Sequence, residues 1–371
     1  MFKNINNHYI LFFLLLFITL KSVEASQPYR SNYTDTTKRK IKNLIFPLIG
    51  RAPETNWAFG IASATIFSTK SSDTLLRTST IPIGIIYTLK NQIIAGFGAN
   101  IYFPGEKYIL RLENTFSKFP DRFWGMGYNS LETNMENYAF GQFYFNPIFL
   151  RKIFKDYFAG LTYEYQSVFY MKYTEGGIFD KENILGKNGG SVSGLGYEIS
   201  KDSRNNSYSP SKGVLIRLVG VAFNKRLFSN FNYLSTELDF RQYNRIFKKH
   251  VLCFQFISTV TAGDVPFRSM AVLGGNLIMR GFYSGRYRDL SMFALQTEYR
   301  FPIWWRFGAV GFAGIGQVSK KITNLHLGFL KYSIGGGLRF AIIPKEKLNI
   351  RFDYGFANGS RNFYIVLSEA F

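Results

Sequence analysis

The sequence contains little of the chemistry that most enzymes and metalloproteins use. Its 371 residues include one cysteine, Cys253, and three histidines, His8, His250 and His326. A single cysteine cannot form an internal disulfide or a cysteine-based zinc site, and the histidines are too far apart in sequence to suggest a cluster. No Gly-x-Ser-x-Gly nucleophile elbow is present. The sequence therefore predicts a protein without catalytic residues, metal ions or cofactors.

Long apolar runs are also absent beyond the start of the chain, so no transmembrane helix is expected there. The run from Ile10 to Leu20 follows the positive charge of Lys3 and precedes Val-Glu-Ala at positions 23–25. This pattern is typical of a secretory signal peptide, here residues 1–25, cleaved near Ala25. Residues 26–40 are polar, and we expect them to form a short periplasmic lead-in.

Negative charge is scarce, because 24 Asp and Glu residues oppose 45 Lys and Arg residues, which leaves a net charge of +21. Binding to nucleic acid is one interpretation of such a balance. The basic residues are scattered over predicted strand ends and connections, however, and Lys38-Arg39-Lys40 is the only tight run near the start. No known nucleic-acid-binding module is present. Anionic membrane lipids therefore account for the charge better than nucleic acid does, although a biased genome composition would also raise it.

Aromatic residues and glycine are abundant, with 39 Phe, 24 Tyr and 34 Gly. Much of the chain alternates, as in Leu290 to Pro302, where Gln296, Glu298 and Arg300 are interleaved with bulky apolar residues. One polar and one apolar row are typical of a membrane strand with a wet lumen inside and lipid outside. The sequence therefore predicts an all-β fold, a transmembrane antiparallel β-barrel of about sixteen strands over residues 41–371. The expected strands are 41–51, 56–69, 75–89, 92–103, 106–117, 138–150, 156–171, 189–202, 212–225, 230–244, 248–262, 289–302, 305–318, 330–343, 347–357 and 361–370.

The lengths of the connections agree with this strand count. If the first strand starts in the periplasm, connections after odd-numbered strands face outward and connections after even-numbered strands face inward. The three longest connections, 118–137, 172–188 and 263–288, follow odd strands, whereas the short ones at 151–155 and 245–247 follow even strands. Long outer loops and short periplasmic turns are the rule for bacterial outer-membrane barrels. The sequence thus predicts a location in the outer membrane of a Gram-negative cell.

Three short motifs resemble those of a known family. The motifs are Gly274-Gly275 with Met279-Arg280-Gly281-Phe282, then Glu298-Tyr299-Arg300-Phe301-Pro302, and Asp202-x-Arg204 with Pro210 and Gly213. In order and spacing they resemble the inward loop, the following strand and a periplasmic turn of the BamA/TamA outer-membrane assembly superfamily, also called the bacterial surface antigen family. Phe371, an aromatic residue after an alternating strand, resembles the C-terminal signal of outer-membrane barrels.

The resemblance implies that the connection 263–288 folds back into the lumen. The planar guanidinium of Arg280 would meet an ionised carboxylate in bidentate geometry, and Gly281 would let the backbone approach the wall. Glu298 projects into the lumen by its place in the alternation, so we expect it to pair with Arg280. The family has a second acid on the next strand, where this chain has Gly314, so we expect Arg280 to depend on Glu298 alone. A purely structural role, in which this pair plugs and stiffens the barrel, is the alternative.

Family members with assembly or secretion roles carry soluble POTRA domains before the barrel, whereas this chain has only residues 26–40 there. We therefore expect a barrel-only member, for which the recognition of clients cannot be carried over from the family.

Two functions fit the sequence better than an enzyme does. One is a relative of the assembly insertases, which would act on membrane lipids or client outer-membrane proteins through a weak seam between the first and last strands. Pro47 in the first strand and Gly359 before the last strand suit such a seam. The other is a passive pore or a structural surface antigen, for which the inward loop predicts small and unsteady conductance.

Overall fold

The computed structural model describes residues 41–70, 72–73, 76–324, 326–344 and 347–371 of the chain. The predicted signal peptide, residues 1–25, and the predicted lead-in, residues 26–40, lie outside the described residues. Within the described ranges, no helix is long and apolar enough to cross a membrane.

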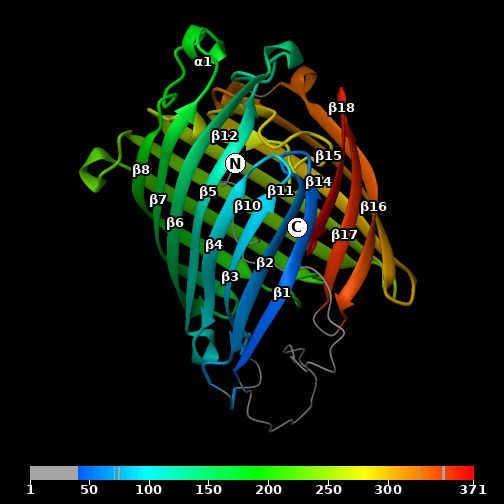
Figure 1. The fold of residues 1–371 in the computed structure, drawn as a ribbon. Coiled ribbons are helices and arrows are strands. Elements are labelled where there is room, and N and C mark those ends of the chain that lie inside the picture. Colours follow the sequence, from blue (N-terminus) through cyan, green and yellow to red (C-terminus); the bar gives the residue numbers. More distant parts are fainter. Residues whose placement is uncertain (1–40, 71, 74–75, 325, 345–346) are drawn as a thin grey trace.

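Sixteen antiparallel strands close into one barrel (Figure 1), which confirms the fold predicted from the alternation. The order around the wall follows the chain, and β1 meets β18 to complete the ring. Several strands depart from the expected bounds; β5, for example, runs on beyond residue 117, β6 runs on beyond residue 150, and β3 begins after residue 75. The strands of the wall are β1 (Lys42–Ala52), β2 (Asn56–Phe67), β3 (Ser79–Thr88), β4 (Ile93–Tyr102), β5 (Tyr108–Phe123), β6 (Glu136–Phe154), β7 (Tyr157–Lys172), β8 (Gly190–Asp202), β9 (Gly213–Phe223), β10 (Tyr233–Arg245), β11 (Val251–Gly263), β14 (Ser291–Trp304), β15 (Phe307–Ser319), β16 (Lys331–Ile343), β17 (Leu348–Ala357) and β18 (Ser360–Leu367).

The two ends of the barrel differ in their connections. We call the end that carries the connections 124–135, 173–189 and 264–290 the outer end, and the short helix α1 (Ile178–Lys181) lies there (Figure 1). The start of β1 lies at the opposite end, which we call the periplasmic end, whereas β18 stops part of the way down the wall, where Ile365 faces Arg51 of β1. The connection 68–78 at the periplasmic end is longer than expected because of the late start of β3.

Side chains alternate between the lumen and the outer surface along each strand. On β14, Gln296 and Glu298 are buried, while Leu295, next to Gln296, is 45% exposed. Neighbouring strands likewise expose bulky apolar residues, such as Ile334 on β16. A large exposed apolar surface is rare on soluble monomers, whereas a charged side chain facing lipid at mid-membrane costs about 2–4 kcal/mol. The pattern therefore fits a wall between lipid and a polar lumen.

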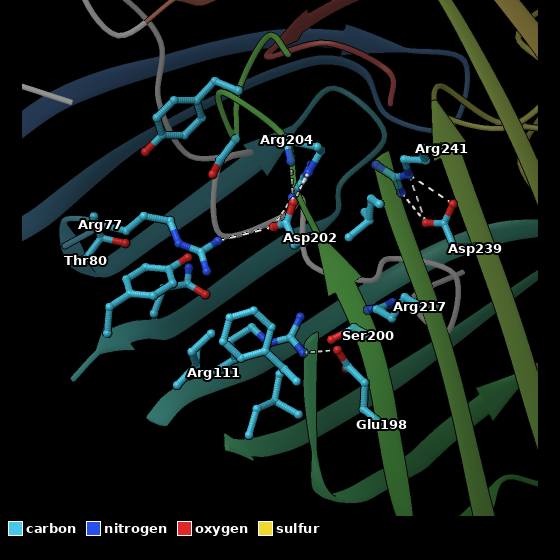
Figure 2. A pocket seen from close by; sticks show the side chains of 18 of the residues that line it. Arg77, Thr80, Arg111, Glu198, Ser200, Asp202, Arg204, Arg217, Asp239 and Arg241 are labelled. Carbon is cyan, nitrogen blue, oxygen red and sulfur yellow. Dashed lines mark hydrogen bonds and ion pairs between the residues drawn. The ribbon is translucent and has the colours of Figure 1, made fainter. Parts of the chain in front are cut away.

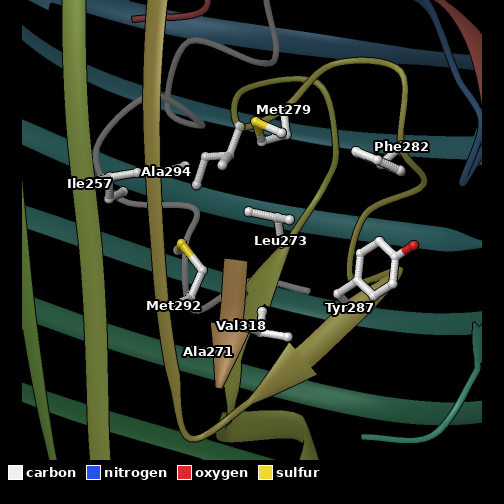
Figure 3. Packing of buried hydrophobic residues seen from close by; sticks show 10 residues of the cluster. Ile257, Ala271, Leu273, Met279, Phe282, Tyr287, Met292, Ala294 and Val318 are labelled. Carbon is white, nitrogen blue, oxygen red and sulfur yellow. The ribbon is translucent and has the colours of Figure 1, made fainter. Parts of the chain in front are cut away.

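The connection between β11 and β14 folds back inside the barrel (Figure 3). It contains a hairpin, β12 (Ala271–Leu273) with β13 (Tyr287–Asp289), that the sequence pattern did not reveal. Leu273, Met279 and Phe282 of this connection form one buried cluster with lumen-facing residues of the wall, including Met292 and Ala294 of β14. Because the cluster removes apolar area from water, it stabilises the inward position of the loop.

The junction between β1 and β18 is much shorter than the other junctions of the wall. A single residue pair, Arg51 with Ile365, joins these strands, whereas eleven pairs join β1 to β2. Within the described part of the chain, the β1 edge from Lys42 to Gly50 therefore has no strand partner on the β18 side. We call this junction the seam.

The last residues of the chain explain why the seam is short. β18 ends at Leu367, so the predicted strand 361–370 was too long. Residues 368–371 leave the wall and turn into the lumen, where Phe371 is buried beside Tyr243 and Cys253 of β10 and β11. We call residues 368–371 the inward tail. The terminal aromatic residue thus packs inside the barrel rather than facing lipid.

Candidate functional site

Arg280, at the tip of the inward loop, is bound by two carboxylates. Its Nη2 lies 2.6 Å from Oε2 of Glu298 on β14, and its Nη1 lies 2.7 Å from Oδ2 of Asp353 on β17. All three side chains are almost completely buried. The guanidinium carbon also lies 3.6 Å from the ring centre of Phe312 on β15. The expectation that Arg280 depends on Glu298 alone is therefore wrong. We call Arg280, Glu298 and Asp353 the loop lock.

Glycines explain how an acid on β17 takes this position. Gly337 of β16 is the register partner of Asp353, and a Cβ at this glycine would lie 2.1 Å from Oδ1 of the aspartate. The missing side chain lets Asp353 lean across β16 towards the loop. At Gly314, where the family has its acid, an added Cβ would lie 2.9 Å from Sδ of Met279. The loop occupies that space, and β17 supplies the second acid instead.

Ion pairs continue from the loop lock to the inward tail through two arginines of the wall. Arg339 on β16 lies 2.5 Å from the β17 aspartate and 2.6 Å from Glu369 of the tail. Arg300 on β14 lies 2.7 Å from Glu298 and donates through Nη2 to the main-chain O atom of Phe371 at 2.6 Å. Loop and tail thus share one buried network of charges, in which each contact depends on its neighbours.

The backbone next to Arg280 is held by β18. The N–H of Gly281 donates to Oη of Tyr364 at 3.0 Å, and the carbonyl of Gly281 accepts from Nδ2 of Asn362 at 2.6 Å. The hydroxyl of Tyr364 donates in turn to the carbonyl of Phe282 at 3.1 Å. Gly281 has a φ of 117°, and a Cβ there would lie 2.9 Å from the main-chain carbon of Phe356. Glycine is the residue that allows this conformation so close to the wall.

The same loop contacts the other side of the seam. The N–H of Ser284 donates at 2.5 Å to Oε1 of Glu54, which lies in the turn between β1 and β2. Burial raises the pKa of the Glu54 carboxyl to about 7, and the hydrogen bond from Ser284 opposes this rise. One loop therefore binds both β18 and the β1–β2 turn, the two elements that flank the seam at the outer end.

The predicted periplasmic turn lies apart from the loop lock. Asp202 accepts from Nε of Arg204 at 2.8 Å and from Nη1 of Arg77 at 3.2 Å. Gly213 has a φ of 103°, and a Cβ there would lie 2.3 Å from a main-chain oxygen of the same turn. Pro210 is buried in the connection between them. The sequence did not point to Arg77, which reaches this motif from the unexpectedly long connection 68–78.

A chamber of about 130 Å³ borders this motif inside the lumen (Figure 2). Arginine side chains dominate its lining, and carboxylates of the wall pair with them. The pairs are Arg111 with Glu198 at 2.5 Å, Arg217 with Glu237 at 2.6 Å and Arg241 with Asp239 at 2.5 Å. Because the charges nearly balance, the chamber favours a structural role over the capture of an anion.

The structure brings most of the predicted lock residues into one cluster and adds others. Arg280, Gly281 and Phe282 of the loop lie with Glu298, Arg300 and Phe371, while Asp202, Arg204, Pro210 and Gly213 form the separate group at the periplasmic end. The residues missed from the sequence are Asp353, Arg339, Glu369, Tyr364 and Glu54. Asp353, Arg339 and Tyr364 stand in the lumen rows of their strands, whereas Glu54 lies in a turn and Glu369 in the inward tail. Their contacts with the loop and with its carboxylates are not visible in the sequence. Across the described residues, no group of His, Cys, Asp or Glu side chains could hold a metal ion.

Comparisons with known proteins agree with this architecture. The model of the Omp85 superfamily domain matches residues 83–371, whereas no curated protein matches the chain. Among solved structures, BamA from Haemophilus ducreyi lacking POTRA domains 1–3 is similar, with a TM-score of 0.58 and 13% identity over 89% of this chain and 70% of that chain.

Two further solved structures have the same fold. CdiB from Acinetobacter baumannii has a TM-score of 0.54 and 12% identity over 90% of this chain and 60% of that chain. CdiB from Escherichia coli has a TM-score of 0.54 and 8% identity over 89% of this chain and 67% of that chain. This chain is therefore similar in fold to these proteins and shorter than each of them. Because the family model covers most of the chain and the sixteen-stranded barrel agrees with it, the protein belongs to the Omp85 superfamily and is an outer-membrane β-barrel.

Proposed function

We propose that this barrel works at its seam, where it assists the insertion or assembly of outer-membrane proteins or lipids. The observation that carries the proposal is the single residue pair between β1 and β18. An unpaired strand edge can accept a strand of another chain by β-augmentation. The β1 edge from Lys42 to Gly50 offers such a template beside the lipid. This role needs no bond-making step, so we propose that the protein is not an enzyme.

Two features keep the seam short. The inward tail is drawn into the lumen by its contacts with Arg339 and Arg300, so it does not extend β18 along β1. Pro47 lies within β1. Proline within a sheet is confined to edge positions because it has no N–H to donate, which fits a strand that lacks a full partner on one side.

The inward loop supports a seam that opens under control. Through Gly281 it is bound to Tyr364 and Asn362 of β18, and through Ser284 it is bound to Glu54 beside β1. These contacts close the outer end of the seam. We infer that the loop releases one side before the strands separate.

A passive pore is the alternative function. The inward loop lies in the lumen and is held there by the loop lock and by its apolar cluster. A wide channel would require these contacts to break, which favours the seam over the lumen as the working part of the barrel.

A disulfide across the seam tests the proposed role. In a Cys253→Ala background, Arg51→Cys and Ile365→Cys would place two thiols at the register pair of the seam. This variant would replace the wild-type protein in its host, and quantitative proteomics would measure the other outer-membrane barrels under oxidising and reducing conditions. We expect the other barrels to fall when the seam is cross-linked and to recover on reduction.

A cysteine pair within the continuous wall is the matched control. Ile49→Cys with Phe59→Cys joins β1 to β2, which are already paired at that register, so its disulfide should leave the other barrels unchanged. Unchanged levels with the seam cross-linked would contradict the proposal and favour a pore or a structural antigen.

A further inference from the structure

A cavity of about 300 Å³ lies at the outer end of the barrel, beside the tip of the inward loop. Its walls come from the β1–β2, β3–β4 and β17–β18 turns and from the end of β5, and the loop contributes Phe282 and Tyr283. Because β1 and β18 flank the seam, the cavity lies next to the seam. Its volume is that of a small-molecule site rather than of a groove for a protein segment.

Positive charge dominates the cavity. Three cations, Lys90, Arg122 and Arg286, line it together with one acid, Glu132. Arg286 lies 2.9 Å from Glu132, but 73% of this glutamate side chain is exposed to solvent. Lys90 donates to a main-chain oxygen of the β1–β2 turn. In the described part of the chain, the Arg122 guanidinium has neither an ion pair nor a hydrogen-bond acceptor, and it lies 5.6 Å from the ring centre of Tyr283.

The buried acids close to this cavity do not neutralise it. Asp121 already accepts from Arg268 at 3.2 Å and from the hydroxyl of Tyr283 at 2.9 Å. Burial raises the pKa of Glu54 to about 7, so much of this carboxyl is uncharged at neutral pH. Burial and a neighbouring arginine lower the pKa of Lys90. The cations therefore repel one another, and a bound anion would relieve that repulsion.

Aromatic rings line the same cavity. The rings of Trp124 and Tyr283 lie 5.2 Å apart in an edge-to-face arrangement. Trp124 is only 2% exposed, yet its Nε1 has no hydrogen-bond acceptor within the described ranges. A buried indole N–H normally donates to an acceptor. The free indole donor of Trp124 therefore indicates that a ligand oxygen belongs in this cavity.

We propose that this cavity binds a phosphorylated sugar, the headgroup chemistry of an outer-leaflet glycolipid. Guanidinium groups match phosphate oxygens in bidentate geometry, which assigns the phosphate to Arg122 with Lys90 beside it. A sugar hydroxyl fits the indole N–H of Trp124. A site next to the seam lets the acyl chains of such a lipid stay in the membrane. Binding here does not require the seam to open.

Calorimetric titration of the purified barrel in detergent tests this site. Glucosamine 1-phosphate is the probe, and inorganic phosphate and glucosamine are the reference ligands. We expect the probe to bind saturably with one site per barrel and at least about tenfold more tightly than either reference. Arg122→Gln should weaken binding of the probe by about tenfold or more, because it removes a charge-assisted hydrogen bond. Arg122→Lys keeps the positive charge but lacks the planar pair of donors of a guanidinium group. It should therefore weaken binding of the probe less than Arg122→Gln does.

Arg226→Gln is the matched control, because Arg226 is an exposed arginine of the outer connection 224–232 that does not line the cavity. This variant should bind the probe as the wild type does. The barrel with its seam cross-linked should also bind normally, which separates this proposal from the proposed function. Equal affinity of wild type and Arg122→Gln, or equal affinity for the probe and for inorganic phosphate, would overturn the proposal.

Nanodiscs distinguish the two sources of the ligand. Displacement of the probe when the barrel is moved into nanodiscs that contain lipid A, a phosphorylated glucosamine lipid, would identify a membrane lipid as the occupant. Undiminished binding of the probe in those nanodiscs would overturn the lipid assignment in favour of a soluble sugar phosphate.

Discussion

Arg280 bridges two buried carboxylates from strands on either side of β15 and β16. Removing one partner of a buried ion pair typically destabilises a protein by about 3–5 kcal/mol, because the other charge is left uncompensated. We therefore expect Arg280→Gln to lower the unfolding temperature of the barrel strongly. Gel electrophoresis after heating separates the folded from the unfolded barrel, and the temperature at which half of the protein has unfolded is compared between the variant and the wild type.

Asp353 tests whether the loop lock has two acids or one. It lies 2.7 Å from Arg280 and 2.5 Å from Arg339, so Asp353→Asn should destabilise the barrel about as much as Glu298→Gln. Glu175→Gln, at an exposed position in the connection 173–189, is the control and should have little effect. Wild-type stability of Asp353→Asn would mean that Glu298 alone holds the arginine.

The raised pKa of Glu54 predicts that the free energy of unfolding depends on pH. Its pKa is raised from the ordinary 4.5 to about 7 in the folded protein, so the folded state holds this proton more tightly than the unfolded state does. The stabilising contribution is therefore full below about pH 4.5 and is lost as the pH rises through about 7, a change on the order of 3 kcal/mol. Glu54→Gln should flatten the unfolding temperature between about pH 5 and about pH 8. An unchanged pH profile in this variant would assign the dependence to other groups.

At the scale of single elements, the inward tail is expected to control the length of β18. Glu369 lies 2.6 Å from an arginine of β16, and this contact holds the tail in the lumen. Continuing the register of the seam would place Ile49 opposite Leu367. In a Cys253→Ala background, a disulfide between Ile49→Cys and Leu367→Cys should form poorly and should form faster when Glu369→Gln is added. No increase in its yield would mean that other contacts keep the tail inside.

The inward loop predicts the electrical behaviour of the barrel. Its apolar cluster and the loop lock hold it inside the lumen, so the wild type should show small and unsteady currents in planar bilayers. Replacing residues 271–289 by a short Gly-Ser linker should give larger and steadier currents, because the barrel wall does not depend on the β12–β13 hairpin for its strand order. Large steady currents through the wild type would instead support the pore.

At the scale of the whole molecule, the seam should be the least protected junction of the wall. Amides open locally where few hydrogen bonds hold a strand. Peptides from β1 (Lys42–Ala52) should therefore exchange hydrogen for deuterium faster than peptides from β14 and β15, which are paired with each other along most of their length. Equal protection of these strands from exchange would indicate that β1 and β18 are hydrogen-bonded along their full length. That result would count against a seam that opens.

The wall strands could be predicted from the sequence, whereas the β12–β13 hairpin and the end of β18 could not, for physical reasons that differ between them. The wall strands were predictable because one side of each strand faces lipid and the other faces the lumen, which leaves an alternating pattern. The β12–β13 hairpin was missed because all residues of Ala271–Leu273 and Tyr287–Asp289 are buried, so no alternation marks them. The end of β18 was misplaced because an ion pair with Arg339, not the local pattern, turns Glu369 inward.

The period of two along a strand is a local property, so the chain alone was enough to define the barrel and to predict that Glu298 faces the lumen. The inward position of Arg280 followed from the resemblance of its motif to a known family. The contacts between lumen residues depend on how the ring closes and how deeply the loop enters it. Arg280 and Asp353 are 73 residues apart in sequence, and they meet only because β16 carries glycine where a side chain would separate them. No local sequence pattern encodes how the ring closes or how deeply the loop enters the lumen. Only the tertiary structure therefore determined that Asp353 is the second acid of the loop lock, that the tail turns inward and that a cavity lies beside the seam.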